Sequence, residues 1–168
     1  HIALKKKIKN LTTIIIPRHI HRVKEIISEI ENFKLTVAIH SKKKGSLKDV
    51  DIYVVDTFGE TNKFHNISGS VFIGKSISKK GGQNPLEAAR FGARILHGPG
   101  TENFKDVYKL LKSLSITKQI NTPEELASSI LFKKNKIIGK KIKNIGKKIL
   151  KKTIKELDSI INNETQKA

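Results

Sequence analysis

The first part of the chain contains two kinds of hydrophobic pattern: short continuous apolar runs, and apolar residues that recur every three or four positions. Residues 11–16 (LTTIII) are a β-branched run that ends at Pro17, which lacks a backbone donor, so a buried strand is predicted there. Residues 22–32 carry apolar side chains at helical spacing, at Val23, Ile26, Ile27 and Ile30. A second strand is expected at 35–39. The pattern therefore begins with a strand, a helix and a strand.

The same alternation continues to residue 114. Further strands are expected at 51–55, 70–73 and 94–97, and helices at 85–91 and 102–114. Strands that alternate with helices indicate a parallel sheet covered by helices on both faces. Ligands bind such sheets beyond the carboxyl ends of the strands. The segments to inspect are therefore 17–19, 56–60, 74–87 and 98–101.

The end of the chain differs in kind. Between residues 133 and 163 apolar side chains recur every three or four positions, which predicts one long amphipathic helix, or two interrupted near Gly139 or Gly146. Eleven lysines and no acidic residue lie from Lys133 to Lys155. We therefore expect a globular domain at 1–132 and a lysine-rich helical tail at 133–168.

Charge is concentrated at the two ends of the chain. The 168 residues contain 34 Lys and Arg against 15 Asp and Glu, a net charge of +19, and residues 1–48 and 133–168 carry +9 each while 49–132 carry +1. A basic excess favours a polyanion, either nucleic acid or an anionic membrane, although solvated faces explain it equally well. The absence of Cys excludes disulfides, and a chain without Met that starts at His1 is expected to be a fragment or a processed product.

One segment matches the P-loop sequence pattern but lacks the strand and helix that normally flank a P-loop. Residues 69–76 (GSVFIGKS) match GxxxxGK[ST], the phosphate-binding P-loop. A P-loop needs a strand before its first glycine and a helix from its last residue. Here residues 64–68 are only a weak strand candidate, residues 71–73 themselves have strand character, and 76–82 (SISKKGG) cannot start a stable helix. The context therefore argues against nucleotide triphosphate binding by this segment.

Residues 81–87 (GGQNPLE) form a better candidate for an anion site. Asn84 is a suitable N-cap, Pro85 suits the first helical position, and Glu87 would complete a capping box. Free N–H groups at a helix start favour an anion, and Gly81 and Gly82 would let a ligand approach the backbone. Plain capping explains the same residues. Residues 122–125 (TPEE) have similar chemistry without glycines and are interpreted as a structural cap.

Two shorter segments follow strands. Pro17-Arg18-His19 would place a guanidinium, which suits phosphate, at the ligand edge of the sheet. Residues 57–60 (TFGE) offer a glycine free to adopt positive φ and a carboxylate for a sugar or base edge. A solvated Arg after a strand explains the first segment equally well, and an ordinary turn explains the second. His19 and His21 are interpreted as a loop feature, and no catalytic set of residues is evident.

Taken in order, the PRH, DTFGE, GGQNPLEA and GP to NF segments resemble the C-terminal half of a Kdo (3-deoxy-D-manno-octulosonic acid) transferase. The resemblance covers about residues 1–132, and GGxNPLE followed by GP and NF is its most specific part. It implies a Rossmann-like domain of a GT-B glycosyltransferase that binds CMP-Kdo. The positions implied to contact CMP are Pro17, Arg18, Phe58, Gly59, Glu60, Asn84, Pro85, Leu86 and Glu87, with Gly81 and Gly82 as phosphate-loop candidates.

The resemblance implies inverting transfer of Kdo to a lipid A precursor in lipopolysaccharide biosynthesis, without a metal or other cofactor. The catalytic base would be a Glu in a missing N-terminal domain, so no catalytic residue is expected here and the fragment alone should be inactive. The acceptor would be held by that missing domain. The implied location is the cytoplasmic face of the bacterial inner membrane, held peripherally or through the missing part.

This sequence departs from the family at three points, and other functions stay open. Lys75 stands where a second Gly is usual, Gln83 where His is common, and 61–66 (TNKFHN) where an apolar helix is expected. Another GT-B nucleotide-sugar enzyme is one alternative, and a basic nucleic-acid-binding module is a second. The second is disfavoured because the tail has no Arg and no aromatic residue after Phe132. For the tail itself, the alternatives are packing back across the sheet or onto the missing domain, and lying on an anionic membrane.

Overall fold

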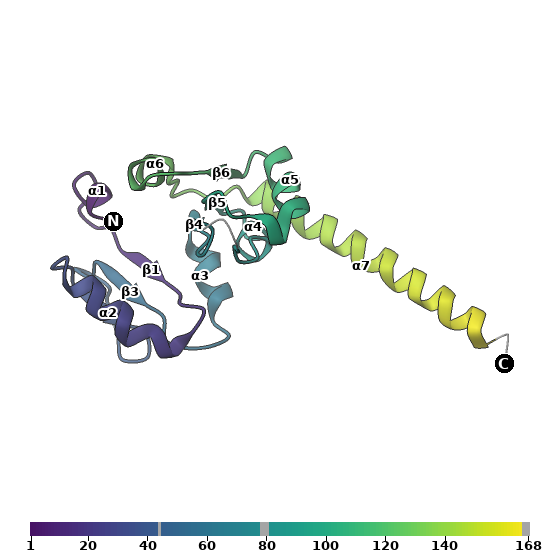
Figure 1. Cartoon of the computed structure of the whole chain (residues 1–168), viewed down its shortest axis with the longest axis horizontal. Helices are drawn as coiled ribbons and strands as arrows, with labels where there is room; N and C mark the ends of the chain where they lie inside the picture. The colour runs from purple at the N-terminus through teal and green to yellow at the C-terminus, as the bar shows by residue number, and fades with distance from the viewer. Residues whose placement is uncertain (44, 78–80, 166–168) are drawn as a thin grey trace. The chain divides into compact units, whose positions relative to one another are not determined.

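The chain divides into two compact units. Unit 1 comprises His1–Ile67 and Asn121–Ser129, and unit 2 comprises Ser68–Ile120 and Ile130–Ala168. The computed structural model describes residues 1–43, 45–77 and 81–165, with 163–165 described only in their backbone. Residues 78–80 of the predicted loop and the last three residues of the tail lie outside this part. Figure 1 labels most of the helices and strands. The division expected between 132 and 133 stays a prediction.

Unit 1 contains a three-stranded parallel sheet. Strands β1 (Thr13–Ile15), β2 (Val37–Ile39) and β3 (Ile52–Val54) lie in the order β1-β3-β2. Ile14 of β1 and Ala38 of β2 both pair with Tyr53 of β3. The helices are α1 (Ile2–Lys5), α2 (Val23–Glu31), α3 (Thr61–Ile67) and α6 (Pro123–Ser129), with a 3₁₀ turn, η1 (Ile20–Arg22), before α2.

Helices cover both faces of this sheet. Ile52 and Val54 of β3 pack in one cluster with Val23 of α2. Tyr53 and Val55 pack in a second cluster with Phe64 of α3. Because successive strand residues point to opposite faces, α2 and α3 lie on opposite sides. The predicted fold class, a parallel sheet with helices on both faces, is confirmed in unit 1.

Unit 2 contains a second parallel sheet. Its strands are β4 (Ser70–Phe72), β5 (Arg94–His97) and β6 (Thr117–Gln119), in the order β4-β5-β6. Its helices are α4 (Leu86–Ala89), α5 (Lys105–Ser113) and α7 (Lys136–Thr165), with a 3₁₀ turn, η2 (Glu102–Phe104), before α5. Ile95 of β5, Ala88 of α4, Leu111 of α5 and Ile142 of α7 are buried in one apolar cluster. Three helices therefore share the core of unit 2.

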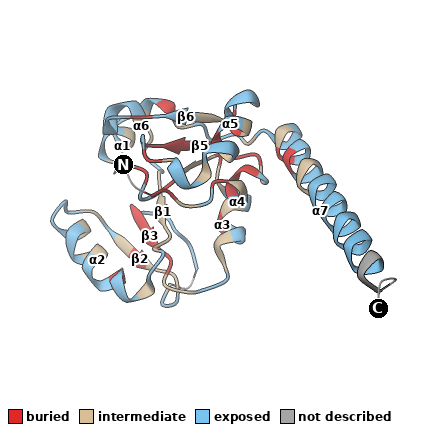
Figure 2. Cartoon of the chain, turned by 45° about the vertical axis from the view of Figure 1, so that its right-hand side comes forward, coloured by how far each residue is buried: buried red, intermediate tan, exposed pale blue. Residues whose placement is uncertain are grey.

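The tail forms one continuous helix of 30 residues, so the alternative of two helices is wrong. Its first turns belong to the core of unit 2. A Cβ at Gly139 would lie 2.8 Å from the amide nitrogen of Gly92, so glycine allows the close approach, and Ile142 is only 2% exposed. Every residue from 147 to 162 is exposed, and Figure 2 shows this change along α7. No described helix is long and apolar enough to cross a membrane.

Several segments differ from the sequence-based expectation, among them α1, which was not predicted. Residues 64–68 were expected to have weak strand character, but residues 61–67 form α3, because Phe64 is buried (8% exposed) while Asn62 and Lys63 stay in solvent. Strand β6 was not predicted. Only Thr117 of its three residues is partly buried, so this polar edge strand lacks the alternating pattern that signals a strand. Tertiary pairing with β5 forms it.

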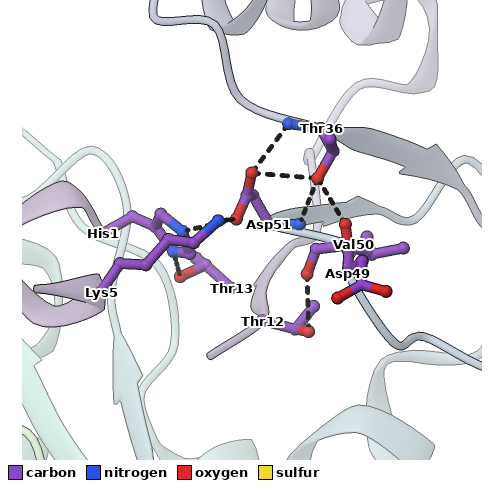
Figure 3. A network of polar contacts seen from close by, with 8 residues as sticks. All are labelled: His1, Lys5, Thr12, Thr13, Thr36, Asp49, Val50 and Asp51. Atoms are coloured by element: carbon purple, nitrogen blue, oxygen red, sulfur yellow. Dashed lines mark hydrogen bonds and ion pairs between the residues drawn. The ribbon is translucent and has the colours of Figure 1, made fainter. Parts of the chain in front are cut away.

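A buried carboxylate joins α1 to the amino ends of the strands in unit 1 (Figure 3). Asp51 precedes β3 and its carboxylate accepts hydrogen bonds from Lys5 and from the backbone N–H and hydroxyl of Thr36 (both 2.9 Å). The Nε2 atom of His1 lies 3.5 Å from the same carboxylate. The pKa of Asp51 is lowered mainly by the hydrogen bond from the Lys5 ammonium, and the Thr36 donors lower it further. These contacts lie at the edge of the sheet opposite to that expected for ligands.

Candidate functional site

Two of the predicted segments lie at one edge of the sheet in unit 1. Pro17 and Arg18 follow β1, and residues 56–60 follow β3, which pairs directly with β1 in parallel. Parallel neighbours end at the same edge, so the structure brings these segments to the carboxyl edge of one sheet. This is the arrangement that the sequence predicted for unit 1.

Several groups at this edge are open to solvent. The Arg18 side chain is exposed and has no hydrogen bond or ion pair to the described residues. Phe58 is 79% exposed, more than the two other exposed phenylalanines, Phe33 (63%) and Phe132 (58%). Gly59 adopts φ of +79°, as its sequence position suggested, and no atom lies within 4 Å of a Cβ placed there. The turn therefore presents a guanidinium, a ring and open backbone.

Glu60 is held in one orientation by three side chains. Its Oε2 atom accepts hydrogen bonds from His40 Nε2 (2.8 Å) and from the Thr57 hydroxyl, and its Oε1 atom accepts one from Lys63. A carboxylate has about four acceptor positions, so one position on Oε1 is left for a ligand donor. Lys63 and Thr57, more than His40, hold the pKa of Glu60 at about 2. Glu60 is therefore an ionised acceptor at neutral pH.

His40 is the residue that the sequence analysis missed. It directly follows β2, its Nδ1 lies 2.7 Å from the Tyr53 hydroxyl, and its ring contacts the Phe64 ring edge-on at 5.4 Å between centroids. Because the Glu60 carboxylate only accepts, His40 Nε2 carries the proton of that hydrogen bond. The rule that ligand-edge residues follow strands would have identified His40, had it been applied to β2 as well.

A hollow opens at the same edge of unit 1. Its volume is about 490 Å³, in the range of small-molecule sites. Ile39 at the end of β2 and Asp56 after β3 line it, together with His21, Lys24 and Lys42. Asp56 accepts hydrogen bonds from the Ser41 backbone (2.9 Å) and hydroxyl, which lower its pKa. The lining does not include Arg18, Phe58 or Glu60.

In unit 2 three loops pack backbone to backbone beyond the carboxyl ends of β4 and β5. Ser76 is fully buried, and its hydroxyl donates to the Ile73 carbonyl and accepts from the Gly98 N–H (2.8 Å). A Cβ at Gly82 (φ +86°) would lie 2.9 Å from the Gly100 carbonyl oxygen. The structure thus brings the GGQNPLE and GP segments together, with Ser76 as an unpredicted link.

The start of α4 is well defined but shifted from the expectation. The helix begins at Leu86 instead of Pro85, and the Asn84 side-chain oxygen accepts the Leu86 N–H (3.0 Å). Glu87 lies in the first turn and makes no hydrogen bond to the described residues, so the reciprocal half of the capping box is absent there. Pro85 is fully buried, and its carbonyl accepts the Ala89 N–H (3.1 Å). Leu86 is partly exposed and packs on the core.

Residue 75 shows why glycine is usual at its position. Lys75 has φ of +61°, the left-handed region that glycine adopts without strain. A Cβ on Gly81 would lie 3.0 Å from the Lys75 side chain, and the Gly82 N–H donates to the Lys75 carbonyl (3.2 Å). Glycine is therefore required at 82 by packing against the Gly100 carbonyl, and at 81 by its φ of +137°. Residues 74–77 form no helix, which agrees with the rejection of a P-loop.

The remaining candidates have structural explanations. The His19 and His21 rings stack, with 5.4 Å between centroids. Within the described residues no group of three or more His, Cys, Asp or Glu side chains is placed to hold a metal ion. At 122–125 the Thr122 hydroxyl accepts the Glu125 N–H (3.1 Å), which confirms the predicted cap of α6.

Several known proteins similar to this chain are named 3-deoxy-D-manno-octulosonic acid transferase. The chain is 35% identical over 129 residues to a 3-deoxy-D-manno-octulosonic acid transferase of Rickettsia felis. These residues are 77% of this chain and 28% of the relative. The Haemophilus influenzae protein of that name is 28% identical over 122 residues, 73% of this chain and 29% of the relative. A bifunctional glycosyltransferase/methyltransferase of Fusobacterium nucleatum is 31% identical over 127 residues, 74% of this chain and 20% of the relative. No family model matches.

A solved structure shares the fold. It is the C-terminal CMP-Kdo binding domain of WaaA from Acinetobacter baumannii, with a TM-score of 0.69 and 22% identity, covering 76% of this chain and 66% of the other. The chain spans little more than a quarter of the length of the Rickettsia relative. The resemblance found in the sequence is confirmed, and the chain is a homologue of these transferases over about three quarters of its length.

Proposed function

We propose that this chain, a homologue of 3-deoxy-D-manno-octulosonic acid transferases, is the donor-binding part of such an enzyme and holds CMP-Kdo. One observation carries the proposal. The segments that resemble the family's CMP-contacting motifs all lie at carboxyl edges of parallel strands or at the start of α4, where ligands of such folds bind. The name of the Acinetobacter domain supports the same ligand.

In unit 1 the proposal assigns contacts to Pro17, Arg18, Phe58, Gly59 and Glu60. The exposed Arg18 guanidinium suits the CMP phosphate, which it can hold with two hydrogen bonds. The exposed Phe58 ring suits stacking on the cytosine or packing on the sugar. Glu60, ionised and with one acceptor position left, suits a hydroxyl or amino donor of the nucleotide.

In unit 2 the proposal assigns contacts to residues 84–87, with Gly81 and Gly82 shaping the loop. Pro85 is fully buried and its carbonyl accepts the Ala89 N–H, so it would act by holding the start of α4, whereas the partly exposed Leu86 would contact the ligand directly. Glu87 is exposed and would repel a phosphate, so ribose hydroxyls are its expected partners. Asn84 is exposed beside them, and its side-chain amide N–H groups make no hydrogen bond to the described residues.

The reaction of the whole enzyme is proposed to be inverting transfer in lipopolysaccharide synthesis. A hydroxyl oxygen of a lipid A precursor attacks the anomeric carbon of Kdo, a base removes its proton, and the bond to the phosphate oxygen breaks with its electron pair on CMP. Arg18 would stabilise the charge on the departing phosphate. We assign the base and the acceptor site to parts beyond this chain, and the enzyme to the cytoplasmic face of the inner membrane.

Titration calorimetry of the chain with CMP, UDP and ATP tests the proposal. We expect CMP to bind best, and Arg18→Gln to weaken CMP roughly tenfold because a charge-assisted contact is lost. Arg22→Gln is the matched control: Arg22 is exposed, pairs with Glu25 at 2.7 Å, and should leave CMP affinity unchanged. Preferential ATP binding, or equal losses in both variants, would contradict the proposal.

A UDP preference would instead support another nucleotide-sugar transferase. The similarity to the Fusobacterium glycosyltransferase/methyltransferase keeps that candidate in view. The fold would serve both, because the donor phosphates bind the same strand edge, so nucleotide preference separates the two.

A further inference from the structure

The second half of α7 has a surface that the donor site does not use. From Lys147 onward the helix leaves the core of unit 2, and its apolar side chains are exposed: Ile149 and Leu150 are each 61% exposed, Ile154 49%, Leu157 53% and Ile160 55%. By contrast Ile142, two turns earlier, is buried in the unit 2 cluster. Figure 2 shows buried residues at the start of α7 and exposed residues beyond.

Apolar and basic side chains separate cleanly around this half of the helix. At about 100° per residue, the five apolar residues fall within an arc of roughly 140°. The lysines fall on the opposite arc, and they are Lys147, Lys148, Lys151, Lys152 and Lys155. Glu156 lies at one boundary of the two arcs and Asp158 near the other. We call the first arc the apolar side and the second the lysine side.

We propose that residues 147–162 of α7 bind an anionic lipid surface. A helix with one apolar side and a lysine-rich opposite side lies in the plane of a membrane interface, with the apolar side at the acyl boundary and the lysines among headgroups. The charge is complementary, because five lysines face two acidic residues over this stretch. The chain then has a membrane contact of its own, independent of the CMP site.

Other occupants fit the helix less well. A second copy of α7 would bring lysines together beside the apolar seam, where paired helices use charges of both signs. Nucleic acid would use the lysines but leave the apolar side in water, and this half of the helix has neither Arg nor an aromatic side chain to contact bases. A lipid surface satisfies both sides at once.

Vesicle co-sedimentation of the full chain is the first test, with phosphatidylglycerol/phosphatidylethanolamine vesicles against pure phosphatidylcholine. We expect binding to the anionic vesicles that weakens with salt. Leu150→Ser with Leu157→Ser should lower it at least tenfold, and Lys151→Gln with Lys155→Gln about tenfold. The control, Lys105→Gln with Lys109→Gln on the exposed side of α5, removes the same charge and should bind nearly as wild type.

Because the chain has no Trp, a single tryptophan reports the orientation. Trp at Ile154 (I154W) should show a blue-shifted emission on anionic vesicles, and Trp at Lys152 (K152W), on the lysine side, should not. CMP affinity should stay unchanged in all variants, which separates this proposal from the donor site.

Four results would overturn the proposal. Two concern charge: equal binding to neutral and anionic vesicles, and binding that neither salt nor the Lys151→Gln, Lys155→Gln variant weakens. The other two are unchanged binding of the serine variant and equal emission shifts for both tryptophans. A dimer in sedimentation velocity that Leu157→Ser dissolves would assign the apolar side to a second copy. Salt-sensitive DNA binding that the serine variant retains, without vesicle binding, would assign the lysines to nucleic acid.

Discussion

Unit 1 contains two carboxylates with the same kinds of partner at opposite edges of one sheet. Asp51, before β3, is contacted by a lysine, a histidine and a threonine (Lys5, His1 and Thr36). Glu60, after β3, is also contacted by a lysine, a histidine and a threonine (Lys63, His40 and Thr57). The difference is burial, since the Asp51 side chain is 6% exposed and that of Glu60 is 23% exposed.

Burial decides what each carboxylate can do. At Asp51 the backbone N–H and hydroxyl of Thr36 share one oxygen and Lys5 takes the other, so the group ties α1 to the strands. At Glu60 the partners are side chains at a solvent-facing edge, and one acceptor position is left. The same chemistry therefore stabilises the fold at one edge and presents a charged acceptor at the other.

The largest effect should follow from Asp51→Asn. The amide would remove the charge beside Lys5 and turn a donor toward existing donors, so we expect the free energy of unfolding to fall by about 2–3 kcal/mol. Urea unfolding followed by circular dichroism measures it. Asp49→Asn is the control, because Asp49 is exposed with φ of +63°, which Asn tolerates. Equal losses in both variants would contradict a special role for Asp51.

Glu60→Gln should separate binding from stability. CMP affinity should fall roughly tenfold as the ionised acceptor is lost, while the free energy of unfolding should change little, because exposed pairs are screened by solvent. Calorimetry and urea unfolding of the same sample give both values. A loss of stability as large as that of Asp51→Asn, with CMP binding intact, would mean that Glu60, like Asp51, serves the stability of the fold and not ligand binding.

His40 should act through Glu60. We expect His40→Ala to weaken CMP about threefold to fivefold, because Glu60 loses one of the donors that orient it, and His40→Gln to restore part of the affinity. Lys63→Gln is the comparison, since Lys63 is 75% exposed and such a pair contributes little. Equal effects of His40→Ala and Lys63→Gln would remove the positioning role of His40.

Lowering the pH should reduce the stabilisation that Asp51 and Glu60 each contribute to the fold. The pKa of each carboxyl is lowered by folding, so the stabilisation is present above the ordinary values of 3.8 for Asp and 4.5 for Glu and is lost as pH falls. For Glu60 the loss should extend from about pH 4.5 to about pH 2. Thermal unfolding across this range should show a shallower decline for Glu60→Gln than for wild type. Parallel curves would contradict the lowered pKa.

The sequence was most informative where local patterns are strong. The strand at residues 94–97, the α2 stripe and the cap at Thr122 were predicted and observed, because β-branched runs, helical periodicity and side-chain caps act over a few residues. The motifs after β1 and β3 were also placed at a strand edge correctly. The assignment of their residues to CMP stays a prediction.

Other features were beyond local reasoning. Strand β6 is polar and exists only because β5 pairs with it. Helix α3 forms on a single buried anchor, Phe64. His40 and Ser76 acquire roles from partners 20 and 22 residues away, Glu60 and Gly98.

The sequence by itself therefore determined the class of fold, the motifs and the segregation of lysines in the tail, since these depend on residue spacing. Only the tertiary structure decided which of two similar carboxylates is buried, why glycine stands at 82, and where α7 leaves the core. Those features depend on which atoms approach one another across the fold, and the free energy of burial or of a close backbone contact is set by that neighbourhood.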